Sequence, residues 1–172
     1  MKTLTIGDLK ARIPIIQGGM GVGISLSGLA SAVANEGGIG VISAAGLGLL
    51  YKKLSPSNYT EAGNLGLAEE IRKAREKAKG IIGVNVMVAL SDFAELVKTS
   101  IAEKVDIIFS GAGLPLDLPS FLKKDSVTKL VPIVSSARAV RIICEKWKNN
   151  YDYLPDAVVL AVSYTHLTLP TT

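Results

Sequence analysis

Glycines and small polar residues gather directly after short apolar runs in this chain, and these are the positions where it could bind a ligand. The clearest case is residues 14–23, where an apolar run leads into four glycines within six residues. Glycine has no Cβ, so its backbone tolerates positive φ and can approach a flat or charged ligand closely. A strand that opens into such a loop ahead of a helix also presents backbone N–H groups to a bound group. The pattern therefore predicts a ligand-binding loop.

Similar signals occur later in the chain. Asn85 lies inside an apolar run, where a polar side chain needs a hydrogen-bond partner, either a ligand or another protein group. Gly111 and Gly113 follow another apolar run. Ser135 and Ser136 follow a third and precede an expected helix, where serine is also a favoured N-cap.

The elements that must position these residues alternate between strand and helix. Six predicted strands are joined by five helical connections, which requires parallel strands and right-handed crossovers. Asp92 with Glu95 three residues later resembles a capping box at one helix start. The predicted strands are residues 13–17, 40–44, 81–88, 106–110, 130–134 and 157–161, and the main predicted helices are 27–35, 67–78, the segment after Asp92, and 137–149.

Two architectures are compatible with this alternation: an open doubly wound sheet and an eight-stranded barrel. In a barrel the ligand loops follow many strands, whereas an open sheet concentrates them at one switch point. Glycine or small polar residues follow the first, second, fourth and fifth predicted strands. We therefore expect an α/β fold of the (β/α)8 TIM-barrel type, incomplete because about six of its eight strands are present.

The composition describes a folded protein without a membrane segment. Of 172 residues, 48% are hydrophobic and 20% charged, with a net charge of +4. The densest basic run is interleaved with acids, and Glu69–Lys73 and Arg72–Glu76 have the spacing of ion pairs on a solvated helix face. No aromatic residues interleave with these charges, so nucleic acid is not an expected partner. No apolar run reaches the roughly 18 residues of a membrane helix.

Cysteine usage and the start of the chain indicate a compartment. Cys144 is the single cysteine, so an internal disulfide is excluded and a reducing environment is favoured. It shares an inward helical stripe with Trp147, which indicates a core residue. No secretory signal is apparent at residues 1–10. We expect a cytoplasmic protein.

Residues 162–172 differ in style from the rest of the chain. They are rich in threonine, uncharged and without helical periodicity. Their sequence resembles the translation of an adapter used in transposon-based DNA sequencing libraries. We expect residues 162–172 to be a non-native tail and the natural protein to continue differently after about Ala161. The alternative is a genuine disordered terminus.

Several segments together resemble the nitronate monooxygenase family, once called 2-nitropropane dioxygenases. The resemblance covers about residues 6–161. It implies an FMN-dependent enzyme in which residues 1–161 form part of a TIM-barrel domain. The family oxidises alkyl nitronates with dioxygen to a carbonyl compound and nitrite, and it is related to a flavin-containing enoyl-acyl-carrier-protein reductase. The segments that carry the resemblance are residues 14–20, 29–40, 83–87 and 111–113.

The resemblance also implies which residues line the FMN, and it exposes a gap. The family's catalytic histidine lies in a Gly-Gly-His segment after the sixth strand, where this chain has Val162, Ser163 and Tyr164. His166, the single histidine, lies in the suspect tail, so we assign no catalytic residue and no metal ligand. Alternatives are an NAD(P)H-dependent enoyl-acyl-carrier-protein reductase and a catalytically inert fragment; an oligomer stays open. The FMN-lining residues implied are Gln17, Gly18, Gly19, Met20, Asn85, Ser110, Gly111, Gly113 and Ser135.

Overall fold

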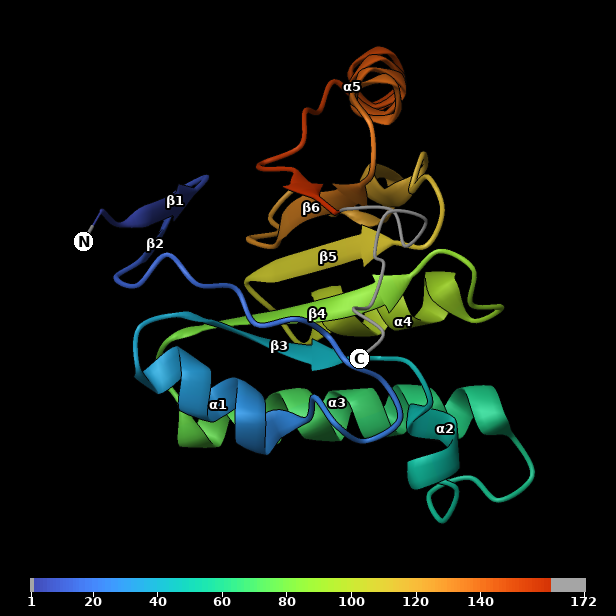
Figure 1. Ribbon diagram of the computed structural model, residues 1–172. Helices are drawn as coiled ribbons and strands as arrows, with labels where there is room; N and C mark the ends of the chain where they lie inside the picture. The colour runs from blue at the N-terminus through green and yellow to red at the C-terminus, as the bar shows by residue number, and fades with distance from the viewer. Residues whose placement is uncertain (1, 162–172) are drawn as a thin grey trace, which may run out of the picture.

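The computed structural model describes residues 2–161 and shows a parallel sheet that curls like part of a barrel (Figure 1). The interpretation of residues 162–172, including His166, lies outside the described residues. All five strands of the main sheet are parallel, and their spatial order follows their order in the chain. A doubly wound sheet reverses its order at a switch point, so the expected incomplete TIM barrel is confirmed. The strands are β3 (Ile39–Ser43), β4 (Ile81–Met87), β5 (Ile107–Gly111), β6 (Lys129–Val134) and β7 (Val159–Leu160).

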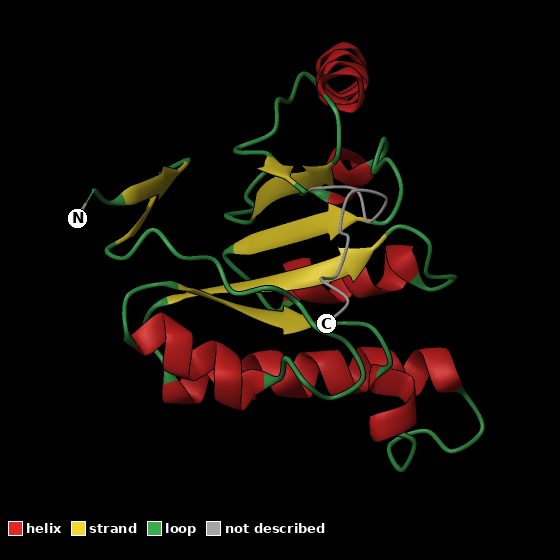
Figure 2. Cartoon of the chain, viewed as in Figure 1, coloured by secondary structure: helices red, strands yellow, loops and turns green. Residues whose placement is uncertain are grey.

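Helices connect these strands on the outside of the curl (Figure 2). The helix expected at 27–35 is present with the same bounds, and Ser136 caps the last helix by accepting a hydrogen bond from Ala139 N at 3.2 Å. The expected helix 67–78 is longer than predicted, because Asn58 caps it and accepts from Glu61 N at 3.1 Å. The helices are α1 (Ser27–Asn35), α2 (Leu47–Leu50), α3 (Tyr59–Lys77), α4 (Phe93–Ala102), the 3-10 helix η1 (Leu118–Phe121) and α5 (Ala137–Tyr151).

The segment predicted as the first strand, residues 13–17, lies along the edge of the sheet but forms few strand-pairing hydrogen bonds. It forms one parallel bridge, between Ile16 and Ile39. Hydrogen bonds join Ile39 N to Ile15 O at 2.9 Å and Gln17 N to Ile39 O at 3.0 Å. Ile15 N donates to Ile13 O at 2.8 Å within the same segment instead of across to its neighbour, so the ladder is interrupted there. The segment nevertheless lies beside β3, where the first strand of a barrel is expected.

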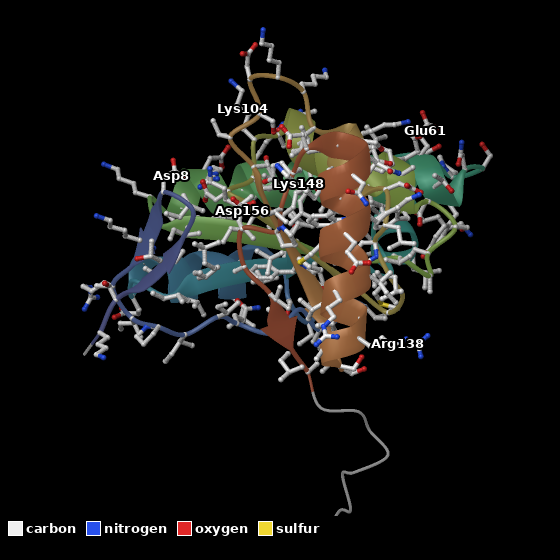
Figure 3. All side chains as sticks on the ribbon, turned by 90° about the horizontal axis from the view of Figure 1, so that it is seen from above. Asp8, Glu61, Lys104, Arg138, Lys148 and Asp156 are labelled. Atoms are coloured by element: carbon white, nitrogen blue, oxygen red, sulfur yellow. The ribbon has the colours of Figure 1, made fainter. Side chains whose placement is uncertain are left out.

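An N-terminal hairpin was not predicted. Strands β1 (Leu4–Ile6) and β2 (Leu9–Ala11) pair antiparallel around Gly7, which has a φ of +58°. Ile6 and Ala11 are buried against apolar side chains of the inner face of the sheet. Lys129 pairs with Asp8 at 2.7 Å, and Figure 3 labels Asp8 on the hairpin. The hairpin thus covers part of the apolar interior of the curl.

A larger core lies between the sheet and the helices, and it depends on one close approach. Gly40 of β3 faces α1, and a Cβ there would lie 1.9 Å from Ala30 O. Because only glycine fits, α1 can pack directly on the strand backbone. Trp147 of α5 is fully buried in the same core and donates from Nε1 to Pro115 O at 2.9 Å.

Two predictions about charged residues were wrong. Arg72 pairs with Glu103 at the end of α4 rather than with Glu76, so it links two helices. Within residues 2–161, Asp92 makes no side-chain capping bond at the start of α4. The predicted Glu69–Lys73 pair is confirmed, and Glu70 beside it is buried. Helical spacing alone could not distinguish these partners, because neighbouring helices supply the competing groups.

Candidate functional site

The loop at residues 18–25 lies at the carboxyl edge of the sheet and is folded back on itself. Ser25 Oγ accepts a hydrogen bond from Met20 N at 3.0 Å and donates one to Gly18 O at 3.1 Å. Ser25 N donates to Met20 O at 2.9 Å, and Ser43 N donates to Ser25 O at 2.9 Å. We call residues 18–25 the glycine loop. One serine therefore closes the glycine loop and joins it to the end of β3.

The glycine loop packs directly on Asn85. A Cβ at Gly19 would lie 2.5 Å from the Cβ of Asn85, closer than carbon atoms approach, so only glycine fits. Asn85 shares the inner face of β4 with Ile81, because residues two and four apart point the same way. Within residues 2–161 its amide forms no side-chain hydrogen bond. The structure thus brings together two predicted site residues and leaves an amide available at the rim.

Gln17, Gly18 and Met20 differ in whether their polar groups and surface remain available to a ligand. The amide of Gln17 is engaged by β3, since Nε2 donates to Val41 O at 2.9 Å and Oε1 accepts from Val41 N at 3.3 Å. Gln17 therefore extends the sheet pairing where regular strand is missing. Around Gly18 a Cβ would meet nothing within 4 Å, and Met20 is 64% exposed. Gly18 and Met20 thus leave an open surface beside Gly19.

A second group of predicted residues lies at the ends of β5 and β6. Gly113 and Ser135 line one cavity of about 360 Å³, next to the first turn of α5. Gly113 has a φ of +141°, which favours glycine. Gly111 lies on the inner face, where a Cβ would be 2.9 Å from the Cβ of Ile133. These residues form an open, small-residue wall.

Ser110 lies apart from the others. It alternates with the inner-face residues Phe109 and Gly111 along β5, so its side chain points toward the helix layer. Its hydroxyl is buried and has no hydrogen-bond partner among the described residues, 2–161. Only the backbone of Ser110 can therefore face the interior of the curl.

Sequence reasoning missed Ser43, which ends β3 on the inner face. Its register partner is Asn85, its side chain is buried, and its hydroxyl finds no hydrogen-bond partner in the part of the chain that the structure describes. Buried polar groups without partners are rare and mark places where a further group is expected. Alternation along β3 would have found Ser43, because Ile39 and Val41 precede it on the same face.

Val22 was also missed, and it carries backbone strain. Its φ is +51°, which is rare for a β-branched residue, and its side chain is 65% exposed. Strain of this kind persists where surrounding contacts enforce it, and it clusters at ligand sites. Val22 N donates to Ala45 O at 2.9 Å, so the strained residue is fixed by the segment after β3.

The chemistry available at this rim is hydrogen bonding and shape, not acid–base catalysis. Between Arg12 and Lys52 the sequence has two ionisable side chains: Glu36, which ends α1 far from the rim, and Tyr51, whose hydroxyl donates a hydrogen bond to Glu70 on α3. The single histidine is His166, so the described residues contain none. Within residues 2–161 no group of three or more His, Cys, Asp or Glu is placed to hold a metal. Across the same residues, no helix is long and apolar enough to cross a membrane.

These features define a class of protein before any comparison: a segment of a (β/α)8 barrel whose ligand loops follow the carboxyl ends of its strands. Solved structures agree. FabK from Thermotoga maritima is 28% identical, has a TM-score of 0.62, and is matched over 86% of this chain and 40% of its own. A nitroalkane oxidase from Streptomyces ansochromogenes shares the fold at 17% identity and a TM-score of 0.65, over 87% of this chain and 46% of its own.

Comparison with family models gives the more specific result. The nitronate monooxygenase model matches residues 2–163, and the chain belongs to that family. No curated protein matches the sequence. The chain spans less than half the length of the two solved structures described above.

Proposed function

We propose that the rim formed by the glycine loop, Asn85, Gly111, Gly113 and Ser135 contacts the ring system of FMN. We propose that the complete protein, with FMN bound at this rim, oxidises alkyl nitronates with dioxygen to a carbonyl compound and nitrite. Bound FMN supplies the redox chemistry, while the protein supplies binding, orientation and electrostatics. The observation that carries the proposal is the close packing of Gly19 on Asn85, whose side-chain amide has no hydrogen-bond partner among residues 2–161.

The residues present fit a flat, polar-edged ring. Glycines at positions 18 and 19 leave the backbone uncovered, so a planar group can approach closely. The amide of Asn85 can both donate and accept hydrogen bonds, as the edge of such a ring requires. Gly113 and Ser135 extend this surface along the ends of β5 and β6. The side-chain amide of Gln17 already pairs with Val41, so Gln17 holds the start of the glycine loop against β3 and does not offer its amide to the ring.

The same rim suits a substrate that is already an anion. A nitronate carries its negative charge before it binds, so it needs no general base. A neutral nitroalkane would first have to lose a proton to a base placed within hydrogen-bond reach. No residue of the rim described above can act as that base at neutral pH. We therefore propose nitronates, not neutral nitroalkanes, as the substrates that this part of the protein can serve.

A second candidate function is supported by the likeness to FabK at 28% identity. It is an NAD(P)H-dependent flavin reductase acting on enoyl thioesters of acyl carrier protein. A third candidate is that residues 1–161 are a catalytically inert fragment, with residues 162–172 a non-native tail.

The experiment is an anaerobic mixing of the purified chain, loaded with FMN, against propyl-2-nitronate and separately against NADH. Loss of the visible flavin absorbance with the nitronate alone supports the proposed function. Loss with NADH alone supports the reductase. No change with either reagent, while FMN stays bound, supports the non-catalytic reading.

A further inference from the structure

Glu70 on α3 is a buried carboxylate that the proposed function does not use. Its side chain is 5% exposed. It accepts a hydrogen bond from Ser27 N at 2.6 Å and another from the hydroxyl of Tyr51. The ammonium group of Lys73 lies 3.6 Å away. A buried charge is tolerated only when it is paired and hydrogen-bonded, so these contacts account for its presence in the core.

The contact with Ser27 caps α1 from another helix. Leu26 occupies the N-cap position and provides no side-chain acceptor, and the first turn of α1 has no acidic residue. Unpaired N–H groups and the helix dipole favour a negative charge at this end. Glu70 supplies that charge. Because Ser27 begins α1 close behind the glycine loop, the carboxylate fixes the far end of that loop.

The contact with Tyr51 holds the segment that follows β3. Tyr51 N donates to Leu47 O at 2.8 Å, which ends α2. The ring lies against Gly66, where a Cβ would be 2.5 Å from Cδ2 of Tyr51. Gly66, Glu70 and Lys73 share one face of α3, as residues three and four apart do. Lys73 Nζ donates to the Tyr51 hydroxyl at 3.3 Å, so both side chains hold the tyrosine on this face.

The two segments that Glu70 holds also contact each other. A Cβ at Gly46 would lie 3.2 Å from the Cα of Val22, and a Cβ at Gly23 would lie 3.2 Å from Cδ1 of Leu50. The bond from Val22 N to Ala45 O joins the same two segments. A shift of residues 44–51 would therefore move the glycine loop, and with it Gly19 over Asn85.

We propose that Glu70 is the positioning residue that holds the glycine loop and residues 44–51 together at the rim of the flavin site. Its role toward flavin rests on the proposed function, whereas its anchoring of the two segments does not. Burial alone would raise the pKa of Glu70, but hydrogen bonds from Tyr51 and Ser27 and the charge of Lys73 hold that pKa below its ordinary value. The carboxylate is therefore charged at neutral pH, as a helix cap requires.

The test is hydrogen–deuterium exchange of the 172-residue chain, read by mass spectrometry, in Glu70→Gln and in the matched control Glu69→Gln. Glu69 is the neighbouring acid and pairs with Lys73 at the surface. We expect exchange in residues 18–27 and 44–51 to rise about tenfold in Glu70→Gln, because the uncharged amide accepts more weakly from Ser27 N and no longer pairs with Lys73. Strand β5 should keep its protection, and Glu69→Gln should match the wild type.

The milder variant Tyr51→Phe removes one contact and should raise exchange in residues 44–51 more than in α1. Unchanged exchange in Glu70→Gln would overturn the proposal, as would an equal rise in β5, which would show a general loss of stability. A parallel FMN titration should show about tenfold weaker binding in Glu70→Gln. If the wild type binds no FMN, the proposed function fails, while the exchange data still decide whether Glu70 anchors the rim.

Discussion

Adding one methyl group at Gly19 should destabilise the protein, while the same change at Gly18 should not. In Gly19→Ala the new Cβ would lie 2.5 Å from the Cβ of Asn85. Carbon atoms in contact are about 3.5–4.0 Å apart, so the glycine loop or β4 must yield by about 1 Å. Overpacking of this kind costs about 1–3 kcal/mol. At about 2–4 °C per kcal/mol for a domain of this size, the Tm should fall by about 2–12 °C.

Gly18→Ala is the matched control for stability, because its Cβ would meet nothing within 4 Å. A surface change without new contacts is expected within about 0.5 kcal/mol of wild type. Both variants can be compared by circular dichroism melts and by urea unfolding of the 172-residue chain. If the two variants melt at the same temperature, the glycine loop does not lie on Asn85 as described, and the geometry of the candidate site is refuted.

Three further predictions concern the core and the buried carboxylate. Gly40→Ala should lower the free energy of unfolding more than Gly19→Ala does, by about 3 kcal/mol or more, because the new Cβ would lie 1.9 Å from Ala30 O on α1. Urea unfolding measures this free energy, and a decrease below about 1 kcal/mol would contradict the close approach. Trp147→Phe should lose about 1–3 kcal/mol, since Pro115 O is left without its donor at 2.9 Å; a variant as stable as wild type would argue against that bond. Because the pKa of Glu70 is lowered in the folded protein, its charge contributes fully to the free energy of unfolding above its ordinary pKa of 4.5, and this contribution is lost as the pH falls below that value. The free energy of unfolding should therefore fall less steeply between about pH 5 and pH 3 in Glu70→Gln than in the wild type. Equal slopes in the two proteins would contradict the capping role.

Elements with strong periodicity and clear end signals could be predicted from the sequence. The helix at 27–35 and the strands around Asn85 and Phe109 were predicted within a residue or two. The hairpin β1–β2 was not, because its strands have three residues each and show no usable alternation. The first half of α3 was missed because residues 55–64 are mostly polar and were interpreted as a connection, and this half of the helix also contains Gly63 and Gly66. They lie inside a helix because Gly48 and Tyr51 pack against them.

The candidate site was predictable as a set of loops but not as a set of side-chain roles. Gly19 and Asn85 could be selected from residue type, and the structure places them in contact. Gln17 looked equally free, yet its amide substitutes for strand pairing, which depends on the register with β3. Ser110 was expected only because the family resemblance implies it, but strand alternation turns its side chain to the helix layer. Glu70 could not be distinguished from Glu69 without knowing which helix lies beside α3.

Titration of the purified chain with FMN and with lumiflavin, which has the ring but no phosphate, tests the account most directly. Flavin fluorescence should show saturable binding of both, with similar affinity, because the rim residues described here address the ring. Asn85→Ala should weaken both by about tenfold, the effect of losing a hydrogen bond in a partly buried site. If neither flavin binds to saturation, or if Asn85→Ala binds as well as wild type, the glycine loop and Asn85 do not form a flavin site.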